Sequence, residues 1–431
     1  MSNTAEAWWS DGKTEAYSPE NHRSVADYAR NVADEHSRPL LELGTPISMA
    51  GANDDFLRDI AGQDYTDLRS GGGVFPFGHR PAFIIEVLTA ALAEVDIGDW
   101  QLPCPLRTEL ARALTSTMLE GSWQWRFFTS GSEGNDFALR TALLSTRRNR
   151  LAGLHGGYHG HTGLTAAMTD ARFLGGEHPS LAAEVVRIHA GDTAALAGEI
   201  DHRAAAVILE PVQLTDGVRP LGADYLRAVR RRCDEVGALL VFDEVKCGLG
   251  RCGLIWAHHR AGVTPDILVA GKALSGGIYP VTAVGVRADE RCAALRGYRH
   301  DARSSFGGSH LGMEVGKAAL AELTSMAASG QFESAGRKLE GELTAAFGQI
   351  SGWLPRLRRC GMAFEIELAD DMLALFVAAD LLHKKIVVPF PKTSALVLLP
   401  PLVISSEIMR HSAAQISQSI VSGRTLLYEG I

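Results

Sequence analysis

Short apolar runs recur through the middle of the chain and predict buried β-strands. These runs lie at 125–129, 185–189, 205–209, 239–242, 267–270 and 281–286. Stretches of helix length and mixed polarity, such as 136–147 and 223–236, separate them. Runs that are apolar on both faces and alternate with helices are typical of a largely parallel sheet covered by helices. The middle of the chain is therefore predicted to be an α/β domain.

The pattern changes after about residue 312. Helical stretches at 314–328 and 333–348 are followed by shorter apolar runs at 362–368 and 396–399. This order predicts a smaller α+β unit. The first 70 residues are too broken to form a domain alone, so we expect them to join that unit. The expected division is an N-terminal segment 1–70, a large domain 71–312 and a C-terminal small domain 313–431.

Composition and charge argue against several classes of protein. The chain has 431 residues, 46% of them hydrophobic, and a net charge of −8 with scattered basic residues, so we expect no nucleic-acid partner. No stretch approaches the roughly 18 uninterrupted apolar residues of a membrane span, and the chain start does not resemble a secretory signal. Six cysteines without such a signal predict reduced thiols and a cytoplasmic protein.

A glycine motif at 248–253 suggests a dinucleotide-binding loop but fits one poorly. A pyrophosphate loop needs free backbone N–H groups and a helix start at the end of a strand. Here Asp243 and Glu244 stand immediately before the glycines, and no acidic residue follows the last glycine at the required spacing of about 20 positions. A nicotinamide cofactor is therefore disfavoured.

Two polar side chains at predicted strand ends form a stronger candidate site. Asp243 closes the run at 239–242, and Lys272 follows the run at 267–270. Open α/β sheets bind ligands at the C-terminal ends of their strands. Burial lowers the pKa of a lysine, and the neutral amine can form a Schiff base.

A third element is the turn Ser130-Gly131-Ser132, which precedes a helix expected to begin near Asp136. Hydroxyls and free N–H groups at a helix N-terminus form a phosphate site. A Schiff-base lysine, a buried carboxylate and a phosphate site together indicate pyridoxal phosphate, whose pyridine nitrogen is kept protonated by an aspartate.

At these residues the chain resembles the class III aminotransferases, which are fold type I pyridoxal-phosphate enzymes and include relatives like glutamate-1-semialdehyde aminomutase. The resemblance runs from about residue 51 to 404. The matching stretches are Gly71-Gly72-Gly73-Val74, Gly78-His79, Ser130-Gly131-Ser132-Glu133, Tyr158-His159-Gly160, Glu210-Pro211-Val212-Gln213, Phe242-Asp243-Glu244-Val245, Gly250-Arg251-Cys252-Gly253, Pro265-Asp266, Gly271-Lys272-Ala273 and Pro400-Pro401-Leu402. The resemblance implies an α/β large domain with a mostly parallel sheet between helices and a small α+β domain formed by both termini.

The resemblance also implies roles for individual residues. Lys272 would be the catalytic Schiff-base lysine and proton carrier, and Asp243 would pair with the pyridine nitrogen. The other expected cofactor-binding residues are Ser130, Gly131 and Ser132 at the phosphate, Tyr158 and Val245 on the two faces of the ring, and His159, Glu210, Gln213 and Lys246 around it. Helix capping remains the alternative for Asp243 and the serines, and a core role for Tyr158.

Ser305 and Phe306 resemble a family Thr-Phe pair whose hydroxyl reaches the phosphate of the neighbouring subunit. A homodimer with a shared active site is therefore expected. The alternative for Ser305 is a loop serine that caps the following helix.

No metal site is predicted. His155, His159 and His161 have no second cluster in the sequence that completes a ligand set, and the same holds for Cys247 and Cys252.

The chain departs from the family at three places. Val397 stands where many members carry an arginine that clamps the substrate carboxylate. Thr215 stands where a glutamate often pairs with that arginine, and Asp216, one position further, is the alternative for that glutamate. Lys246 replaces a common glutamine, so its ammonium is expected to hold the phenolate or the phosphate, to bind an anionic substrate, or to lie exposed. The usual Gly-Asn-Pro is Gly308-Ser309-His310.

These features predict an aminotransferase that acts on an amine or amino-acid-like compound in a biosynthetic pathway, without the standard clamp for glutamate. An aminomutase, racemase, decarboxylase or carbon–carbon bond-forming enzyme on the same scaffold is the alternative. A binding protein or a nicotinamide oxidoreductase is the hypothesis from a different class.

Overall fold

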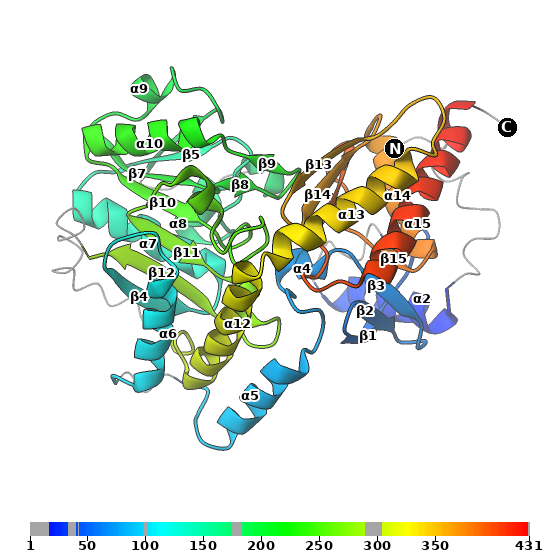
Figure 1. Cartoon of the computed structure of the whole chain (residues 1–431), viewed down its shortest axis with the longest axis horizontal. Helices are drawn as coiled ribbons and strands as arrows, with labels where there is room; N and C mark the ends of the chain where they lie inside the picture. Colours follow the sequence, from blue (N-terminus) through cyan, green and yellow to red (C-terminus); the bar gives the residue numbers. More distant parts are fainter. Residues whose placement is uncertain are drawn as a thin grey trace.

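The computed structural model describes residues 17–32, 40–41, 43–98, 102–174, 183–288 and 304–429. Figure 1 shows a large part built around one twisted sheet and a smaller part that contains both ends of the chain. Among the described helices, none combines the length and the apolar character that crossing a membrane requires.

The large part is organised around a seven-stranded sheet with the order β4-β12-β11-β10-β7-β5-β6. Its strands are β4 (Trp123–Phe128), β5 (Arg150–Leu154), β6 (Glu184–Ile188), β7 (Ala204–Leu209), β10 (Leu239–Asp243), β11 (Ile267–Ala270) and β12 (Thr282–Arg287). Only β12 runs antiparallel to its neighbours β11 and β4. The predicted mostly parallel sheet is thus confirmed, with β5 as a strand that the apolar pattern missed.

Helices cover both faces of this sheet. Alternate residues of one strand face opposite clusters: Leu240 and Phe242 pack with the side of α10 (Ala223–Val236), while Leu239 and Val241 pack with α7 (Gly131–Thr146). Because both faces are buried, every residue of β10 is apolar except the last, Asp243.

Helix α7 begins at Gly131, earlier than the expected start near Asp136. The cause is a cap: the Ser130 hydroxyl accepts a hydrogen bond from the Glu133 N–H at 3.2 Å. This bond stabilises a helical turn that contains two glycines. The N-terminus of α7 therefore lies directly at the end of β4.

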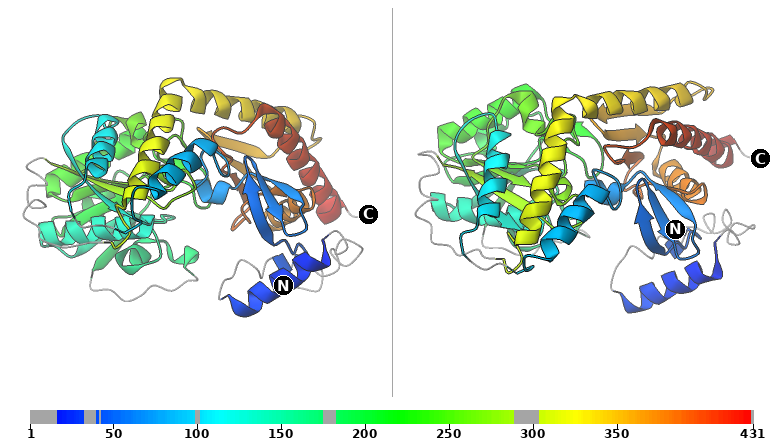
Figure 2. Two further views of the ribbon diagram at one scale, coloured as in Figure 1. Left: turned by 90° about the horizontal axis from the view of Figure 1, so that it is seen from below. Right: turned by 60° about the horizontal axis from the view of Figure 1, so that its bottom comes forward.

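The smaller part combines segments from both ends of the chain, as predicted. Strand β15 (Ile386–Val387) pairs in parallel with β3 (Asp64–Asp67), which continues the antiparallel strands β1 (Met49–Asn53) and β2 (Phe56–Asp59). Figure 2 shows the N-terminal strands beside the C-terminal helices. The remaining elements are α2 (Pro19–Asn31), α13 (Gln331–Phe347), β13 (Arg356–Cys360), β14 (Ala363–Glu367), α14 (Asp371–His383), β16 (Ala395–Leu398) and α15 (Ser406–Arg424).

Helix α12 (His310–Ala328) connects the two parts and packs against α5 (Ala82–Leu92) and α6 (Pro105–Ser116). The predicted boundary at residue 312 lies in the first turn of α12. The domain boundaries stay predictions.

Candidate active site

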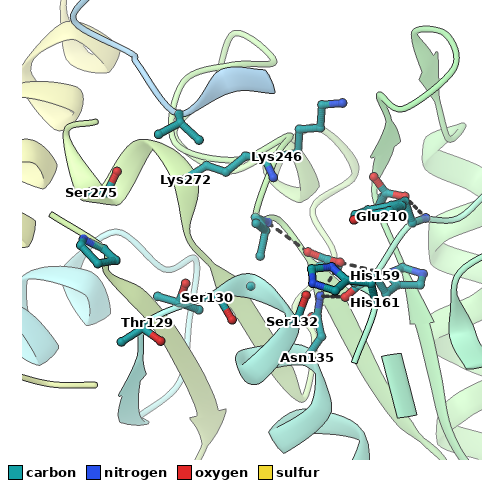
Figure 3. A pocket seen from close by; sticks show the side chains of 18 of the residues that line it. Thr129, Ser130, Ser132, Asn135, His159, His161, Glu210, Lys246, Lys272 and Ser275 are labelled. Carbon is teal, nitrogen blue, oxygen red and sulfur yellow. Dashed lines mark hydrogen bonds and ion pairs between the residues drawn. The ribbon is translucent and has the colours of Figure 1, made fainter. Parts of the chain in front are cut away.

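A cavity of about 320 Å³ opens at the C-terminal ends of the central strands. Figure 3 shows the side chains that line it. Ten of the predicted site residues meet there: Ser130, Gly131, Ser132, Tyr158, His159, Glu210, Asp243, Val245, Lys246 and Lys272.

Asp243 lies at the base of the cavity and is held by two side-chain donors. Its Oδ2 accepts hydrogen bonds from Asn135 Nδ2 at 2.7 Å and from His159 Nδ1 at 2.9 Å. The Val245 N–H donates to its Oδ1 at 3.1 Å. These three donors fix the position of the buried Asp243 carboxyl group.

Asn135 is a site residue that the sequence reasoning did not single out. Its amide group donates both to Asp243 and to the His159 carbonyl at 2.9 Å, which joins the two. Its Oδ1 is buried and has no partner among the described residues. The sequence feature that could have indicated Asn135 is an asparagine in the first helical turn, next to glycines. This pattern also occurs at ordinary helix starts.

Lys272 also lines the cavity, at the start of the 3₁₀ turn Lys272–Ser275. Its φ of +40° is unusual for a residue with a side chain. Burial lowers the pKa of the Lys272 amine, while Asp243 and Glu210 oppose that shift. The strand end thus places a lysine with a reduced proton affinity where a ligand can reach it.

The N-terminus of α7 forms a cup beside these two residues. A Cβ added to Gly131 would lie 2.8 Å from Val245 Cγ1, so only glycine lets the helix start approach the loop after β10 so closely. The first amide groups of a helix have no acceptor within the helix. Together with the hydroxyls of Ser130 and Ser132, these are donors that could hold a phosphate.

Glu210 is a second carboxylate with a different environment. Its Oε1 accepts a hydrogen bond from the Tyr158 N–H at 3.0 Å. Burial raises the pKa of Glu210 to about 7, against the lowering effect of His159 and with support from the charge of Asp243. Burial also raises the pKa of Tyr158, whose ring lies edge-on to Phe173 at 6.2 Å.

Three predicted residues are not brought to this cavity. The side chain of Gln213 is buried and donates from Nε2 to the His155 carbonyl at 3.0 Å. Ser305 and Phe306 lie exposed in the loop before α12. The expectation for these two concerns a second copy of the chain and stays a prediction.

The glycine motif at 248–253 is a tight turn rather than a pyrophosphate loop. Its own carbonyls accept its N–H groups: Gly253 donates to Gly250 at 2.9 Å and Arg251 donates to Gly248 at 3.3 Å. The Arg251 guanidinium reaches the carbonyls of Met362 at 3.0 Å and Pro400 at 2.6 Å. The motif therefore connects the large part to the small part.

The position of the family's clamp arginine is apolar. Val397 is buried in β16 and packs in a cluster that includes Leu214 and Cys247. Thr215, at the position compared with the clamp glutamate, lines the cavity. No arginine lines this cavity among the residues that the structure describes.

Comparisons with known proteins agree on the family. The class III aminotransferase profile matches residues 42–420. An uncharacterized aminotransferase of Archaeoglobus fulgidus is 33% identical over 355 residues, which cover 81% of this chain and 82% of the relative. The acetylornithine aminotransferase of Mycobacterium tuberculosis is 34% identical over 290 residues, which cover 66% of this chain and 70% of the relative.

The fold has a solved counterpart. The ornithine aminotransferase of Toxoplasma gondii superposes with a TM-score of 0.84 at 22% sequence identity, over 98% of this chain and 99% of that one. At this identity the likeness concerns the fold alone. The family match, the curated relatives and the fold together show that the chain belongs to the class III aminotransferases and is an enzyme of that family.

Proposed function

We propose that this protein is a pyridoxal-phosphate-dependent aminotransferase that acts on a small amine or amino-acid-like substrate in a biosynthetic pathway. The observation that carries the proposal is the meeting of Lys272, Asp243 and the cup at Ser130–Ser132 in one cavity. These groups come from three strand ends that are far apart in the sequence.

The residues present fit this cofactor. The close approach at Gly131 leaves a cradle for a phosphate, and Asp243 offers a charged oxygen to a protonated ring nitrogen. Tyr158 and Val245 line the space between these two ends and would contact the ring, while Lys272 would hold the aldehyde end. When bound, pyridoxal phosphate supplies an aldehyde for the amino group and an electron-withdrawing ring that stabilises negative charge on the substrate carbon.

The chain's own residues would then move one proton. Burial lowers the pKa of Lys272 and so favours its neutral amine, whose Nζ can take a proton from the substrate carbon and return it. Asn135 and His159 hold the Asp243 carboxyl group in place.

The proposal includes a homodimer in which Ser305 and Phe306 of one copy complete the phosphate site of the other. Both are exposed in the loop before α12 and neither lines this chain's own cavity, which supports that arrangement. A serine hydroxyl can donate to a phosphate as the family's threonine does.

The test is covalent trapping of the cofactor. We expect borohydride reduction of the protein with pyridoxal phosphate to label Lys272, and Lys272→Ala to abolish the label and to lower amino transfer by about 100-fold or more. Lys338→Ala, on the exposed face of α13, is the matched control. A label that persists in Lys272→Ala would contradict the proposal.

The same preparation separates amino transfer from the alternatives. Conversion of the bound cofactor to its amine form by an amino donor supports an aminotransferase. Solvent deuterium at the substrate carbon without a keto or aldehyde product would instead indicate a mutase or racemase, and release of carbon dioxide a decarboxylase.

A further inference from the structure

Lys246 is a second lysine of the cavity, and its environment distinguishes it from Lys272. Its Nζ donates to the Leu214 carbonyl at 2.5 Å, which uses one of its three N–H donors. Burial, and next the charge of Lys272, lower the pKa of Lys246 to about 8, while the charge of Glu210 opposes that shift, so Lys246 remains mostly charged at neutral pH. In the described part of the chain no carboxylate forms an ion pair with it.

The two carboxylates of the cavity have other partners. Asp243 is bound by Asn135 and His159, and Glu210 accepts from the Tyr158 N–H. The charge of Glu210 acts on Lys246 without a direct contact, so the partly buried ammonium is stabilised further by an anion that arrives with a ligand.

The direction of the side chain separates Lys246 from the phosphate cup. Figure 3 shows its ammonium pointing away from Lys272 and from Ser130 and Ser132. A cofactor phosphate in the cup would therefore lie on the other side of Lys272. This arrangement assigns the end of the cavity near Lys246 to the substrate.

That end of the cavity is also where the clamp residues are missing. The Leu214 side chain, whose backbone carbonyl holds Lys246, packs in the same apolar cluster as Val397. Thr215 follows Leu214 and lines the cavity. The nearby charges of Arg69 and Arg251 add to the positive potential felt by Lys246.

We propose that Lys246 binds a carboxylate of the amino substrate and so takes the role of the missing arginine. This inference rests on the proposed function and names the chemical class of its substrate: an amino compound with an acid group. One ammonium with two remaining N–H donors matches the two oxygens of one carboxylate.

The test compares two substrates that differ by one carboxylate, L-ornithine and 1,4-diaminobutane, in single-turnover reactions of the full-length holoenzyme. Lys246→Gln should lower the ratio of their efficiencies by about tenfold or more, because a charge-assisted hydrogen bond is lost for one substrate only. Lys246→Arg should keep most of the preference. Lys338→Gln removes the same charge from the exposed face of α13 and should leave the ratio as in the wild type.

Taking a ratio separates a substrate contact from an effect on the cofactor. If Lys246→Gln slows both substrates equally, the lysine serves the cofactor and the proposal is wrong. If it lowers only the ornithine reaction, the proposal is supported.

Calorimetric titration with glutarate, a dicarboxylate without an amino group, tests the contact without turnover. We expect glutarate to bind the wild-type holoenzyme about tenfold or more tightly than Lys246→Gln. Equal binding, or no binding to the wild type, would overturn the inference even in an active aminotransferase. Lysine-dependent glutarate binding by a protein that transfers no amino group would instead overturn the proposed function and leave the carboxylate site standing.

Discussion

Three buried carboxyl groups lie in or near the cavity, and each has different hydrogen-bond donors around it. Asp243 is bound by an asparagine and a histidine, and Glu210 by a single N–H. Glu244 accepts from the N–H groups of Ala257 and His258 and from the His258 ring, so it fixes the loop after β10. Three carboxyl groups are thus placed at the base of the cavity, in its wall and in the loop that supports it.

The raised pKa of Glu210 predicts how stability depends on pH. The folded protein holds this proton up to about pH 7, whereas the ordinary pKa is 4.5. Stability contributed by Glu210 is therefore complete below pH 4.5 and lost as the pH rises to about 7. Glu210→Gln can still accept from the Tyr158 N–H, and it should raise the free energy of unfolding at pH 8 relative to pH 5 by roughly 1–3 kcal/mol.

Urea unfolding of the cofactor-free protein at the two pH values measures this difference. Glu322→Gln, on the exposed face of α12, serves as the control. A difference between pH 5 and pH 8 that is the same in Glu210→Gln and the wild type would show that Glu210 is already ionised in the folded protein.

Single residues also show how far the sequence could predict the site. Lys272 and Asp243 could be found because each follows an apolar run at a strand end. The role of Asn135 could not, because its bond to Asp243 joins positions 108 residues apart. Gln213 matched a motif, but its side chain turned to a backbone carbonyl outside the cavity. The direction in which a side chain points depends on how the chain packs, and the spacing of residues along the sequence does not give this information.

At the scale of elements, the cup at the N-terminus of α7 depends on how closely this helix packs on the sheet. A Cβ added to Gly134 would lie 2.8 Å from Thr282 Cγ2 and 3.0 Å from Val269 Cγ1, closer than side-chain atoms normally approach. Helix α7 can therefore lie this close to the sheet only because Gly134 has no side chain.

A matched pair of glycine substitutions tests this packing. Gly134→Ala should lower the free energy of unfolding by about 1–3 kcal/mol, because the methyl group has no space. Gly341→Ala, in an exposed turn of α13 with nothing within 4 Å, should raise it by about 0.5–1 kcal/mol. Denaturant unfolding measures both values, and a stabilising Gly134→Ala would contradict the close approach.

The elements themselves were largely predictable. Apolar runs located six strands of the central sheet because burial on both faces leaves a continuous signal. Strand β5 was missed because its residues, Arg150–Leu154, include an arginine, an alanine and a glycine although all five are buried. The Arg150 guanidinium is paired with Asp201 and Glu184, which are distant in the sequence.

At the scale of the whole molecule, a close backbone contact helps to hold the two parts together. A Cβ added to Gly361 would lie 2.1 Å from the Gly253 nitrogen, and the Met362 N–H donates to the Arg251 carbonyl at 2.8 Å. The turn between β13 and β14 therefore rests directly on the loop that follows Asp243.

Gly361→Ala should disrupt this contact, because the added methyl group would overlap the facing backbone. Gly361 has a φ of +60°, and Gly330, with a φ of +70° and nothing within 4 Å, provides a control with the same backbone strain. We expect Gly361→Ala to lower the free energy of unfolding by at least about 2 kcal/mol more than Gly330→Ala does. Equal values for the two variants in denaturant unfolding would show that the joint tolerates a methyl group.

The same contact between the two parts contains the thiol of Cys360, which is activated but buried. A hydrogen bond from Cys252 and the Arg260 guanidinium, 3.0 Å from the sulfur, lower the pKa of Cys360 to about 6. The thiolate that results is the reactive form, yet the residue is only 3% exposed. A reagent can therefore alkylate Cys360 only when this contact opens. The rate of alkylation then reports how often the two parts separate.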